Sequence, residues 1–597
     1  MILVFGGTTE GRKAVEVLEE AGNVYYYSTK TGEQDIALHH GQRIDGALDE
    51  EAMLAFCQGH DIRLMVDAAH PFASQLHQTI AHVSVSLNIP VIRYERIYPP
   101  RDPSITWIDD YSHVPTDIHS LLATTGVQSI SRLRYLETQG IKVIYRILNR
   151  ESSIRLARQQ GATDDQLCFY EDARDIPVEA DAILLKESGL TGGFPEKVEA
   201  AKQKGMRIIA LKRPQLSIVN SPWSMVNGPY GLQRAVEKLL PEFFPLHSGL
   251  TTGTCATAAA VAQTMRLLKN ERPEEVPVVL PNGETIHVPV GYGDGYAYCI
   301  KEAGDDPDVT DGLEIRASLT PIPSPKGEGG IEIHGGEGVG RFTLPGFDYP
   351  PGEAAINKVP REMIRQNLKE LYEQSKLPSL GEGLGVGLSV PHGADIARRT
   401  FNPRLGIEGG ISIIGVSGIV KPFSEEAFID SIRKCMTVAK ASGAERVVIN
   451  SGGKSERFVK ALYPDLPQQA FVEYGNYIGE TLKIANELGF KYVTLGVMLG
   501  KAVKLAQGHL DTHSRKATMD KAFIQQILDE ANCQLSMVNG QLSLARELWE
   551  MIPSDKMNTF ATTVIRHCDK YCCPLLPNGQ LTILLIDDNG KIFTTTN

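Results

Sequence analysis

The sequence predicts an α/β protein, and its first half carries the pattern most clearly. Short β-rich runs such as 1–5 (MILVF) and 182–186 (AILLK) alternate with helical patterns. This alternation is typical of βαβ units and a parallel sheet. A stretch rich in Pro and Asp at 100–115 interrupts the series. We therefore expect two parallel-sheet subdomains, at about 1–105 and 116–243.

The second half predicts a different, α+β domain over 246–597. The βαβ pattern stops at Pro241–Pro245, and a Thr- and Ala-rich stretch begins after it. Within this domain, two Gly-, Pro- and Ser-rich segments at about 320–331 and 376–388 interrupt well-patterned sequence. Low apolar content and repeated Gly indicate flexible surface insertions.

The composition indicates a cytoplasmic protein of several domains. At 597 residues, the chain is too long for one core. No apolar run approaches the roughly 18 residues of a membrane span, and MILVF lacks the basic lead-in of a signal peptide. The nine scattered cysteines suggest reduced thiols. A net charge of −12 disfavours nucleic acid, whereas a local basic pocket can still hold an anionic small molecule. A homo-oligomer remains open.

A glycine- and threonine-rich turn follows the first strand. Gly6 and Gly7 allow a tight strand-to-helix turn, Thr8 or Thr9 can cap the helix, and Gly11 allows close packing. The free N–H groups of such a helix start can hold a dinucleotide pyrophosphate. The G-x-G-x-x-G fingerprint fails because position 8 is Thr, so a merely structural turn is the alternative.

The end of the second strand bears on the choice of nicotinamide cofactor. A ribose-binding carboxylate stands about 20 residues after the first glycines in NAD sites. Here Ser28, Thr29 and Lys30 occupy that place. Hydroxyls and a lysine suit a 2′-phosphate, so NADPH is favoured over NADH, with a solvated lysine as the alternative.

A second possible anion site follows the strand at 182–186. Lys186 ends this strand, and Ser188 and Gly189 lead into a Gly192-Gly193 loop before a helix. Ligands bind at such carboxyl ends in doubly wound sheets. His70 also directly follows a strand, so it is a candidate for ligand contact, although a lone histidine is more often structural.

Three motifs in the first half together resemble the precorrin-6A reductase family of cobalamin biosynthesis. They are GGTTEGR, VDAAHPFA followed by IPVIRYER, and LLKESGLTGG followed by KVEAA and LKRP. The resemblance covers about 1–240 and implies two Rossmann-like subdomains with a nicotinamide cofactor between them. It implies that Gly6 to Arg12 and Ser28 to Lys30 lie near the cofactor. It also implies cofactor or substrate contacts for the following residues: His70, Lys186, Ser188, Gly189 and Lys197.

An acidic loop in the second half, KEAGDDPDVTDG, offers further candidates. Asp305 and Asp306, with Asp308 and Asp311, can bind a divalent metal or orient a cationic substrate. The alternative is an Asx-rich turn. We expect no resident metal.

Glycine-rich segments at 335–341 and 401–427 suggest a shaped ligand cleft without naming the ligand. Near a later helix, Lys501, His513 and Arg515 form a possible clamp for carboxylates.

These second-half motifs resemble the cobalt-precorrin-5B C1-methyltransferases, which use S-adenosylmethionine. The resemblance covers about 247–597 and implies a methyltransferase domain of its own type. As hypotheses, we assign substrate contacts to Lys197, Arg404, Lys501, His513 and Arg515. We assign S-adenosylmethionine contacts to the following residues: Thr252, Gly253, Thr254, Gly335, Gly336, Gly338, Gly409, Gly410 and Gly415.

Together the two resemblances imply a bifunctional enzyme. It would methylate cobalt-precorrin-5B to cobalt-precorrin-6A and reduce that product to cobalt-precorrin-6B. The catalytic candidates are His70, Lys186, Asp305 and Asp306, and the proton donor for the reduction stays unassigned. The alternative is an NADPH-dependent reductase fused to a non-catalytic tetrapyrrole-binding or sensor domain, since Ser131, Asp311 and Met498 depart from the family patterns.

Overall fold

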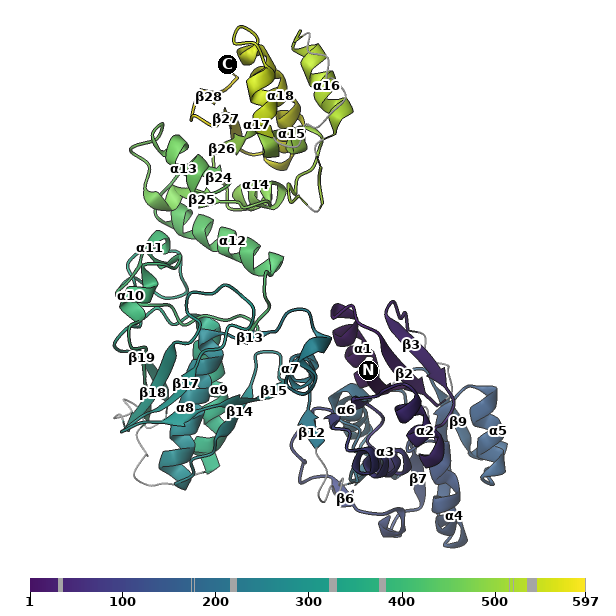
Figure 1. Ribbon diagram of the computed structural model, residues 1–597. Coiled ribbons are helices and arrows are strands. Elements are labelled where there is room, and N and C mark those ends of the chain that lie inside the picture. Colours follow the sequence, from purple (N-terminus) through teal and green to yellow (C-terminus); the bar gives the residue numbers. More distant parts are fainter. Residues whose placement is uncertain are drawn as a thin grey trace. The chain divides into compact units, whose positions relative to one another are not determined.

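The chain forms two compact units (Figure 1). Unit 1 comprises 1–248 and 277–287, and unit 2 comprises 249–276 and 288–597. The tip of the hairpin made by β14 (Glu275–Val279) and β15 (Thr285–Pro289) therefore belongs to unit 1. This computed structural model describes the following residues: 1–30, 36–172, 174–176, 178–214, 223–321, 330–374, 383–514, 516–518, 520–533 and 545–595.

The first sheet of unit 1 has six parallel strands in the order β12-β5-β4-β1-β2-β3. Strand order reverses between β1 and β4, which is the switch point where open α/β sheets bind ligands. Its strands are β1 (Ile2–Phe5), β2 (Tyr25–Thr29), β3 (Gly41–Asp45), β4 (Leu64–Asp67), β5 (Val91–Tyr94) and β12 (Trp223–Val226). Its helices are α1 (Thr9–Glu20), α2 (Glu50–Gly59), α3 (Ser74–Leu87) and α7 (Pro229–Leu239).

The second sheet of unit 1 is also parallel, in the order β6-β11-β10-β7-β8-β9. Its strands are β6 (Thr106–Ile108), β7 (Ser120–Ala123), β8 (Lys142–Leu148), β9 (Leu167–Tyr170), β10 (Ala182–Lys186) and β11 (Arg207–Leu211). Its helices are α4 (Ile130–Thr138), α5 (Glu151–Gln159) and α6 (Phe194–Gln203).

The chain returns to the first sheet after completing the second, so the expected subdomain 116–243 needs correction at both ends. β6 already joins the second sheet, whereas β12 pairs with β5 of the first. Leu232 and Val236 of α7 are fully buried in the same core as Val4 and Leu18. Burial of this apolar helix face determines where α7 packs, and local periodicity carries no information about it.

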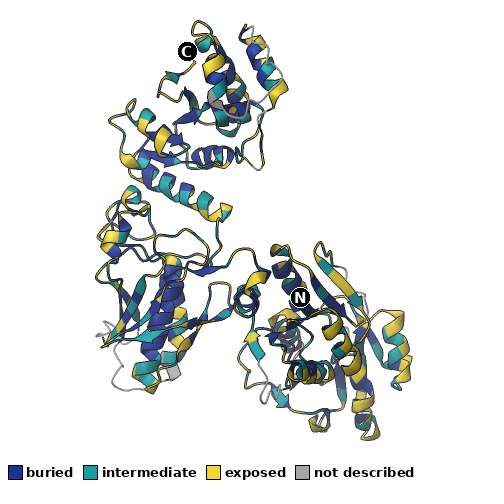
Figure 2. Ribbon diagram, viewed as in Figure 1, coloured by how far each residue is buried: buried dark blue, intermediate teal, exposed yellow. Residues whose placement is uncertain are grey.

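Unit 2 begins with a mixed sheet in the order β16-β17-β18-β21-β19, in which only β19 and β21 run parallel. Against it packs α8 (Thr252–Lys269), buried throughout Thr252 to Thr264 (Figure 2), with α9 (Lys358–Gln374) beside it. The strands are β16 (Gly291–Tyr292), β17 (Ala297–Ile300), β18 (Glu314–Pro321), β19 (Ile331–Gly335) and β21 (Leu384–Ser389).

The expected insertion at 376–388 is wrong in its second part. Residues 384–388 belong to β21, which pairs with both β18 and β19, and Leu384, Val386 and Leu388 are buried. The intervening glycines suggested a loop, but alternation of these apolar residues fits a strand with one face buried. The first insertion, 320–331, likewise begins in β18 and ends in β19. The segments 322–329 and 375–382 lie outside the described residues.

The last sheet of unit 2 has the order β25-β24-β26-β27-β28 and is parallel except for β28. Its order reverses between β24 and β26, giving a second switch point. The strands are β24 (Arg446–Asn450), β25 (Phe471–Glu473), β26 (Tyr492–Met498), β27 (Gln580–Ile586) and β28 (Ile592–Phe593). The helices are α12 (Glu425–Ala441), α13 (Gly453–Lys460), α14 (Ile478–Glu487), α15 (Leu499–Ala506), α16 (Lys521–Glu530), α17 (Ala545–Met551) and α18 (Met557–Cys572).

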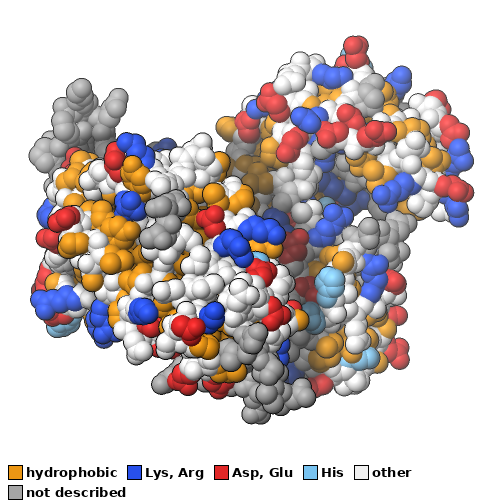
Figure 3. Space-filling view, turned by 90° about the horizontal axis from the view of Figure 1, so that it is seen from above, with side chains coloured by type: hydrophobic (Ala, Val, Ile, Leu, Met, Phe, Trp, Pro, Cys, Tyr) orange, Lys and Arg blue, Asp and Glu red, His pale blue; other side chains and the backbone are white. Residues whose placement is uncertain are grey.

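Short elements complete unit 2: β13 (Gly249–Leu250) pairs with β23 (Ile419–Val420), and β20 (Arg341–Phe342) pairs with β22 (Ile407–Glu408). Two short helices, α10 (Gly393–Ala397) and α11 (Asn402–Leu405), precede β22. No helix among the described residues is long and apolar enough to span a membrane. On the face seen in Figure 3, cationic and anionic side chains are interspersed.

Candidate functional site

A cavity of about 1160 Å³ lies at the carboxyl edge of the first sheet, and we call it the crevice. The switch point between β1 and β4 lies within it, since residues that follow both strands line it. The sequence-predicted residues among its lining are Gly6, Gly7, Thr8, Thr9, Arg12, Ser28, Thr29, Lys30 and His70. The structure thus brings both predicted cofactor segments and the predicted histidine to one cavity.

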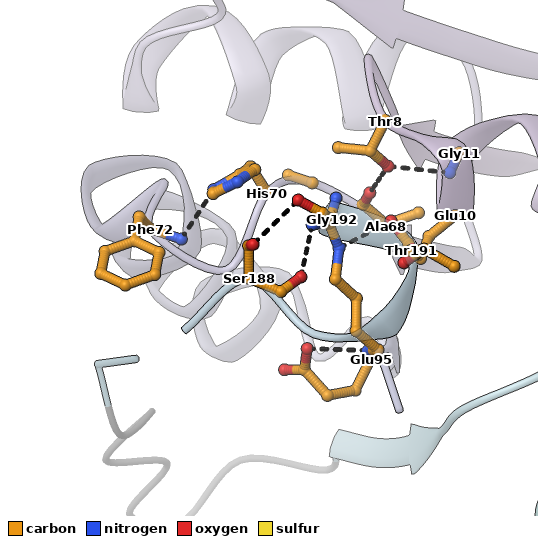
Figure 4. A network of polar contacts seen from close by, with 12 residues as sticks. Thr8, Glu10, Gly11, Ala68, His70, Phe72, Glu95, Ser188, Thr191 and Gly192 are labelled. Carbon is orange, nitrogen blue, oxygen red and sulfur yellow. Dashed lines mark hydrogen bonds and ion pairs between the residues drawn. The ribbon is translucent and has the colours of Figure 1, made fainter. Parts of the chain in front are cut away.

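The glycine turn after β1 is held on three sides. Thr8 caps α1, since its Oγ1 accepts from the N–H of Gly11 at 3.0 Å, and the same hydroxyl donates to the carbonyl of Ala68 at 2.6 Å (Figure 4). A Cβ at Gly6 would lie 2.1 Å from Tyr27 Oη. Gly7 has φ +85°, with open space where a Cβ would be. The turn therefore needs glycine at Gly6 for packing against the ring of Tyr27 and at Gly7 for its backbone conformation.

The three residues at the end of β2 play different roles. Ser28 and Thr29 are buried, and Thr29 Oγ1 donates to Asp45 Oδ1 at 3.1 Å. Lys30 is exposed at the rim of the crevice, as is Arg12 across it. Of the three, Lys30 is therefore the residue placed to meet an anionic group.

His70 enters the crevice as a neutral imidazole. Its Nδ1 accepts from the N–H of Phe72 at 3.2 Å, so the ring hydrogen lies on Nε2 (Figure 4). Burial, together with the charges of Arg96 and Lys186, lowers the pKa of His70 to about 3. His70 can donate a hydrogen bond to a ligand but cannot act as an acid at neutral pH.

A buried ionic cluster that sequence reasoning missed supports the His70 loop. Asp67 is fully buried; its carboxylate accepts from His77 Nδ1 at 2.6 Å and from Arg93 at 2.9 Å. His77 Nε2 in turn lies 3.0 Å from the carbonyl of His70. His77 therefore links the buried carboxylate of Asp67 to the backbone of the His70 loop. The His-x-x-x-x-x-x-His spacing of His70 and His77 was the only sequence signal.

A second cavity of about 630 Å³ lies at the carboxyl edge of the second sheet, and we call it the basic cavity. Five cationic side chains line it: Arg101, Arg132, Lys186, Lys212 and Arg213. Phe72, Ser74 and Gln128 line both this cavity and the crevice, so the two cavities adjoin. Sequence reasoning found Lys186 but missed the other four, which lie outside the quoted motifs or were not singled out within them.

The loop after β10 connects the two sheets. Ser188 Oγ donates to the carbonyl of Gly192 at 3.0 Å, and the Ser188 carbonyl accepts from Arg96 at 2.8 Å (Figure 4). Arg96 also pairs with Glu10 at 2.9 Å, and both side chains are buried. A Cβ at Gly189 would lie 2.9 Å from Arg96 Cβ. Ser188 and Gly189 therefore pack against the buried Arg96. Neither is among the described residues that line the crevice.

Lys197 lies apart from the crevice. It lines a third cavity of about 590 Å³ with Tyr170 and Arg174, and its Nζ donates to the Gly192 carbonyl at 3.2 Å. Burial lowers the pKa of Lys197 to about 8.

In unit 2, the predicted threonine and glycine segments meet one another. Thr252 Oγ1 accepts from the N–H of Ile414 at 2.8 Å, and Thr254 Oγ1 donates to the carbonyl of Gly418 at 2.6 Å. A Cβ at Gly410 would lie 2.1 Å from the Gly338 carbonyl, and one at Gly253 would lie 2.9 Å from Pro360. Close neighbours also surround Gly335, Gly336 and Gly415. Close packing against backbone or side chains accounts for these residues, with the exception of Gly409, where a Cβ would meet open space.

The acidic loop at 305–311 forms mainly internal contacts. Asp308 pairs with buried Lys301 at 2.8 Å, and Asp311 accepts from the N–H of Ala303 at 2.7 Å. Asp306 accepts from the N–H of Phe423 at 3.2 Å, and Asp305 is exposed. No group of three potential ligands for a metal ion occurs in the described parts of the chain.

The carboxyl edge of the last sheet gathers charged residues, including two that were predicted. Lys501, at the start of α15, donates to the Gly475 carbonyl, and Arg404 pairs with Glu456 at 2.9 Å. Between them, Glu473 ends β25, and burial raises the pKa of this carboxyl despite the nearby charges of Arg404 and Lys501. His513 lies beyond α15, and Arg515 lies outside the described residues.

A glycine turn that sequence reasoning missed follows β24 at this edge. Gly452 has φ +147°, and a Cβ there would lie 3.2 Å from Glu473 Oε1, while Gly453 borders open space. Glu473 comes 21 positions after Gly452, on the neighbouring strand. The signal was present in the sequence as NSGGKS followed by a helix and a strand ending in Glu.

Unit 1 thus carries a cavity at the switch point of its first sheet, and unit 2 carries a glycine turn and a carboxylate at the switch point of its last sheet. Comparison with known proteins identifies the families. The family model described as "Precorrin-6x reductase CbiJ/CobK" matches residues 1–228. The family model described as "CbiD" matches residues 241–422.

Relatives of the second half are close. A cobalt-precorrin-5B C(1)-methyltransferase from Prosthecochloris aestuarii is 41% identical over 349 residues, 57% of this chain and 94% of that protein. One from Brucella anthropi is 43% identical over 356 residues, 58% of this chain and 95% of that protein. Among solved structures, the cobalamin biosynthesis protein cbiD from Archaeoglobus fulgidus is similar at 28% identity and a TM-score of 0.26, over 45% of this chain and 83% of that one.

The chain belongs to the cobalt-precorrin-5B C(1)-methyltransferase family. It also carries an N-terminal precorrin-6x reductase part, so it combines a methyltransferase and a reductase of cobalamin biosynthesis in one polypeptide.

Proposed function

We propose that unit 2 methylates C1 of cobalt-precorrin-5B with S-adenosylmethionine and that unit 1 then reduces the product, cobalt-precorrin-6A, to cobalt-precorrin-6B with NADPH. The family membership of unit 2 and the reductase match of unit 1 support these two consecutive steps. The single observation in the structure that carries the reductase half is the crevice at the switch point of the first sheet.

The residues of the crevice fit a nicotinamide dinucleotide. The start of α1, with Gly7 open to the cavity, suits the pyrophosphate. Exposed Lys30 suits a 2′-phosphate on the adenosine ribose. The part of the crevice lined by His70 and Phe72 is then left for the nicotinamide, which supplies a hydride when bound.

The basic cavity fits the other reactant. A tetrapyrrole with several carboxylates needs cations, and five cationic side chains line this cavity. Because the cavity adjoins the crevice at Phe72, a macrocycle held there lies next to the nicotinamide end.

For the methyl donor, we infer a site at the edge of the last sheet. The turn at Gly452 and Gly453 lies at the switch point, and Glu473 ends the neighbouring strand. A carboxylate at this place hydrogen-bonds ribose hydroxyls in dinucleotide sites, and the adenosine of S-adenosylmethionine carries the same ribose. Methyl transfer itself requires in-line positioning, which needs no nucleophile from the chain.

Anaerobic incubation with cobalt-precorrin-5B, S-adenosylmethionine and NADPH tests the proposal, with the tetrapyrrole mass followed by mass spectrometry. We expect a gain of one methyl that requires S-adenosylmethionine, followed by a gain of two hydrogens that requires NADPH. Methylation without reduction under either nicotinamide would contradict the reductase half. Reduction of supplied cobalt-precorrin-6A without any methylation of cobalt-precorrin-5B would support the alternative of a reductase joined to a binding domain.

A further inference from the structure

We propose that Lys186 is the catalytic proton donor of the reduction, giving the proton from its Nζ to the tetrapyrrole as the hydride arrives. The assignment rests on the proposed function of unit 1 and deepens it. Reduction of a double bond requires a hydride at one atom and a proton at the other, so the proton needs a donor of its own.

Lys186 lies where the crevice and the basic cavity of unit 1 adjoin. It ends β10 at the carboxyl edge of the second sheet and lines the basic cavity. Its Nζ lies 5.1 Å from the centre of the Phe72 ring. Because Phe72 lines both cavities, Lys186 stands where the proposed tetrapyrrole site meets the nicotinamide end of the crevice.

The charge environment of Lys186 differs from that of the other cations in the cavity. Each of those four forms an ion pair: Arg101 and Arg213 with Glu187, Arg132 with Asp110, and Lys212 with Asp109. Among the residues that the structure describes, the side chain of Lys186 forms no ion pair and no hydrogen bond, and its Nζ faces the ring of Phe72. A half-buried ammonium without a carboxylate is a stronger acid than a paired one. Burial and the charge of Arg132 lower the pKa of Lys186 to about 8.

The other groups near this junction are poorer proton donors at neutral pH. His70 is neutral, with its Nδ1 engaged by the N–H of Phe72. Burial raises the pKa of Tyr111, which lines the basic cavity. Hydrogen bonds from Ser112, together with the charge of Arg132, lower the pKa of Asp110, which leaves it without a proton to give, and Asp109 pairs with Lys212 at 3.0 Å. Arginines do not release a proton in the working range.

The reduction adds one hydride and one proton across the double bond. The hydride from NADPH forms a C–H bond at one end of the tetrapyrrole double bond, and NADPH is oxidised to NADP⁺. The Nζ–H bond of Lys186 breaks, its proton goes to the other end of the double bond, and the nitrogen keeps the electron pair as a neutral amine. Water returns the proton before the next turnover. A donor with a pKa close to the working pH serves both halves of this cycle.

The test uses the full chain and compares Lys186→Met with Lys212→Met. Both variants remove one cation from the same cavity, but only the first removes the proposed donor. We expect Lys186→Met to lower kcat for reduction of cobalt-precorrin-6A about 100-fold or more, with the Kd for NADPH unchanged. We expect Lys212→Met to raise KM without a comparable loss of kcat. Lys186→Arg keeps the charge and should not restore kcat.

A second measurement is independent of turnover. Competitive labelling of lysines with trace acetic anhydride, quantified by peptide mass spectrometry across pH, reports the protonation of each amine in the free protein. We expect half-maximal labelling of Lys186 near pH 8, with the Lys212 peptide as internal reference. A midpoint near the ordinary lysine value would overturn the assignment.

Three kinetic outcomes would also overturn the Lys186 assignment. In the first two, Lys186→Met keeps the wild-type kcat, or it changes only KM. In the third, Lys186→Met stays active and Tyr111→Phe shows the loss of kcat instead. The failure of the proposed function looks different. In that case the wild-type chain reduces no cobalt-precorrin-6A with either nicotinamide, whereas failure of the Lys186 assignment alone leaves wild-type reduction intact.

Discussion

Unit 1 and unit 2 both carry glycine-rich segments that look alike in sequence, yet the structure uses them differently. In unit 1, the turn at Gly6 and Gly7 borders the crevice, and a Cβ at Gly7 would meet open space. In unit 2, a Cβ at Gly338 would lie 1.8 Å from the carbonyl of Val390, and one at Gly410 would lie 2.1 Å from the carbonyl of Gly338. The glycine turn of unit 1 faces a cavity, whereas Gly338 and Gly410 of unit 2 allow two backbone segments to pack closely against each other.

The difference shows what a glycine motif needs before it indicates a ligand. Glycine is required wherever backbone approaches backbone, so its presence alone does not separate the two roles. The switch point of a parallel sheet supplies the missing criterion, because there the strand ends diverge and leave room. By this criterion the turn at Gly452 in unit 2 is the counterpart of the turn at Gly6, although the richer glycine segments lie elsewhere in that unit.

The largest expected effect comes from filling a backbone crossing. Gly338 has φ +70° and Gly409 has φ +82°, but only Gly338 has a neighbour within reach of a Cβ. We expect Gly338→Ala to destabilise unit 2 by about 4 kcal/mol, from the clash and the left-handed conformation together. Gly409→Ala should cost about 1 kcal/mol, from conformation alone.

Denaturant unfolding of the two variants measures this pair, with tryptophan fluorescence as the signal. NADPH binding by unit 1 should stay intact in both variants. Equal destabilisation by the two substitutions would contradict the packing role assigned to Gly338.

The turn of unit 1 gives the next largest effect. A Cβ at Gly6 would overlap the ring of Tyr27, which is fully buried. We expect Gly6→Ala to destabilise unit 1 by about 2 kcal/mol and to weaken NADPH binding at least about tenfold, because the turn must move. Tyr27→Leu in the same chain makes room for the new methyl group and should recover part of both losses. Calorimetric titration with NADPH and thermal unfolding compare the two single variants with the double variant. If the losses of the two single variants simply added in the double variant, the proposed overlap of a Cβ at Gly6 with Tyr27 would be wrong.

The counterpart turn of unit 2 predicts a loss of binding without a loss of stability. Glu473→Gln should weaken S-adenosylmethionine binding about tenfold by replacing a charged acceptor for ribose. Burial raises the folded pKa of Glu473, so its favourable contribution to folding is complete below the unfolded pKa and is lost as pH rises through the folded pKa. At neutral pH the neutral amide should therefore leave the free energy of unfolding unchanged or higher.

Calorimetric titration with S-adenosylmethionine measures this change, with Glu480→Gln as the control for the same substitution on the exposed face of α14. If Glu473→Gln bound S-adenosylmethionine as tightly as the wild type, the proposed methyl-donor site at this edge would be wrong.

Much of the fold of unit 1 follows from its sequence, because buried parallel strands give continuous apolar runs that local pattern detects. The return of β12 and α7 to the first sheet does not follow, since it depends on which core buries Leu232 and Val236. In unit 2, the strand at 384–389 was obscured by Gly385 and Gly387, whose flanking apolar residues are buried between neighbouring strands.

The sequence predicted the residues that line the crevice better than it predicted the charged residues around them. Residues close in the chain, such as those of the glycine turn, are visible as motifs. The partners that tune them are distant: Arg96 reaches Glu10 across 86 positions, and Arg93 reaches Asp67 across 26. Pairings of this range need the folded sheets, so the basic cavity and the cluster behind His70 could be found only in the structure.

The smallest expected effect sharpens the cofactor assignment in the crevice. Lys30 is exposed at its rim, and a screened contact of one lysine with a 2′-phosphate is modest. We expect Lys30→Met to weaken NADPH binding about fivefold and to leave NADH binding unchanged, because NADH lacks the phosphate. Titration of both nucleotides at two salt concentrations measures the change. We expect the ratio of NADPH affinity to NADH affinity to fall with salt in the wild type and to stay constant in Lys30→Met. Equal weakening of both nucleotides would mean that Lys30 contacts a group common to them, and the preference for NADPH would then have to arise elsewhere in the crevice, with Arg12 as the next residue to replace.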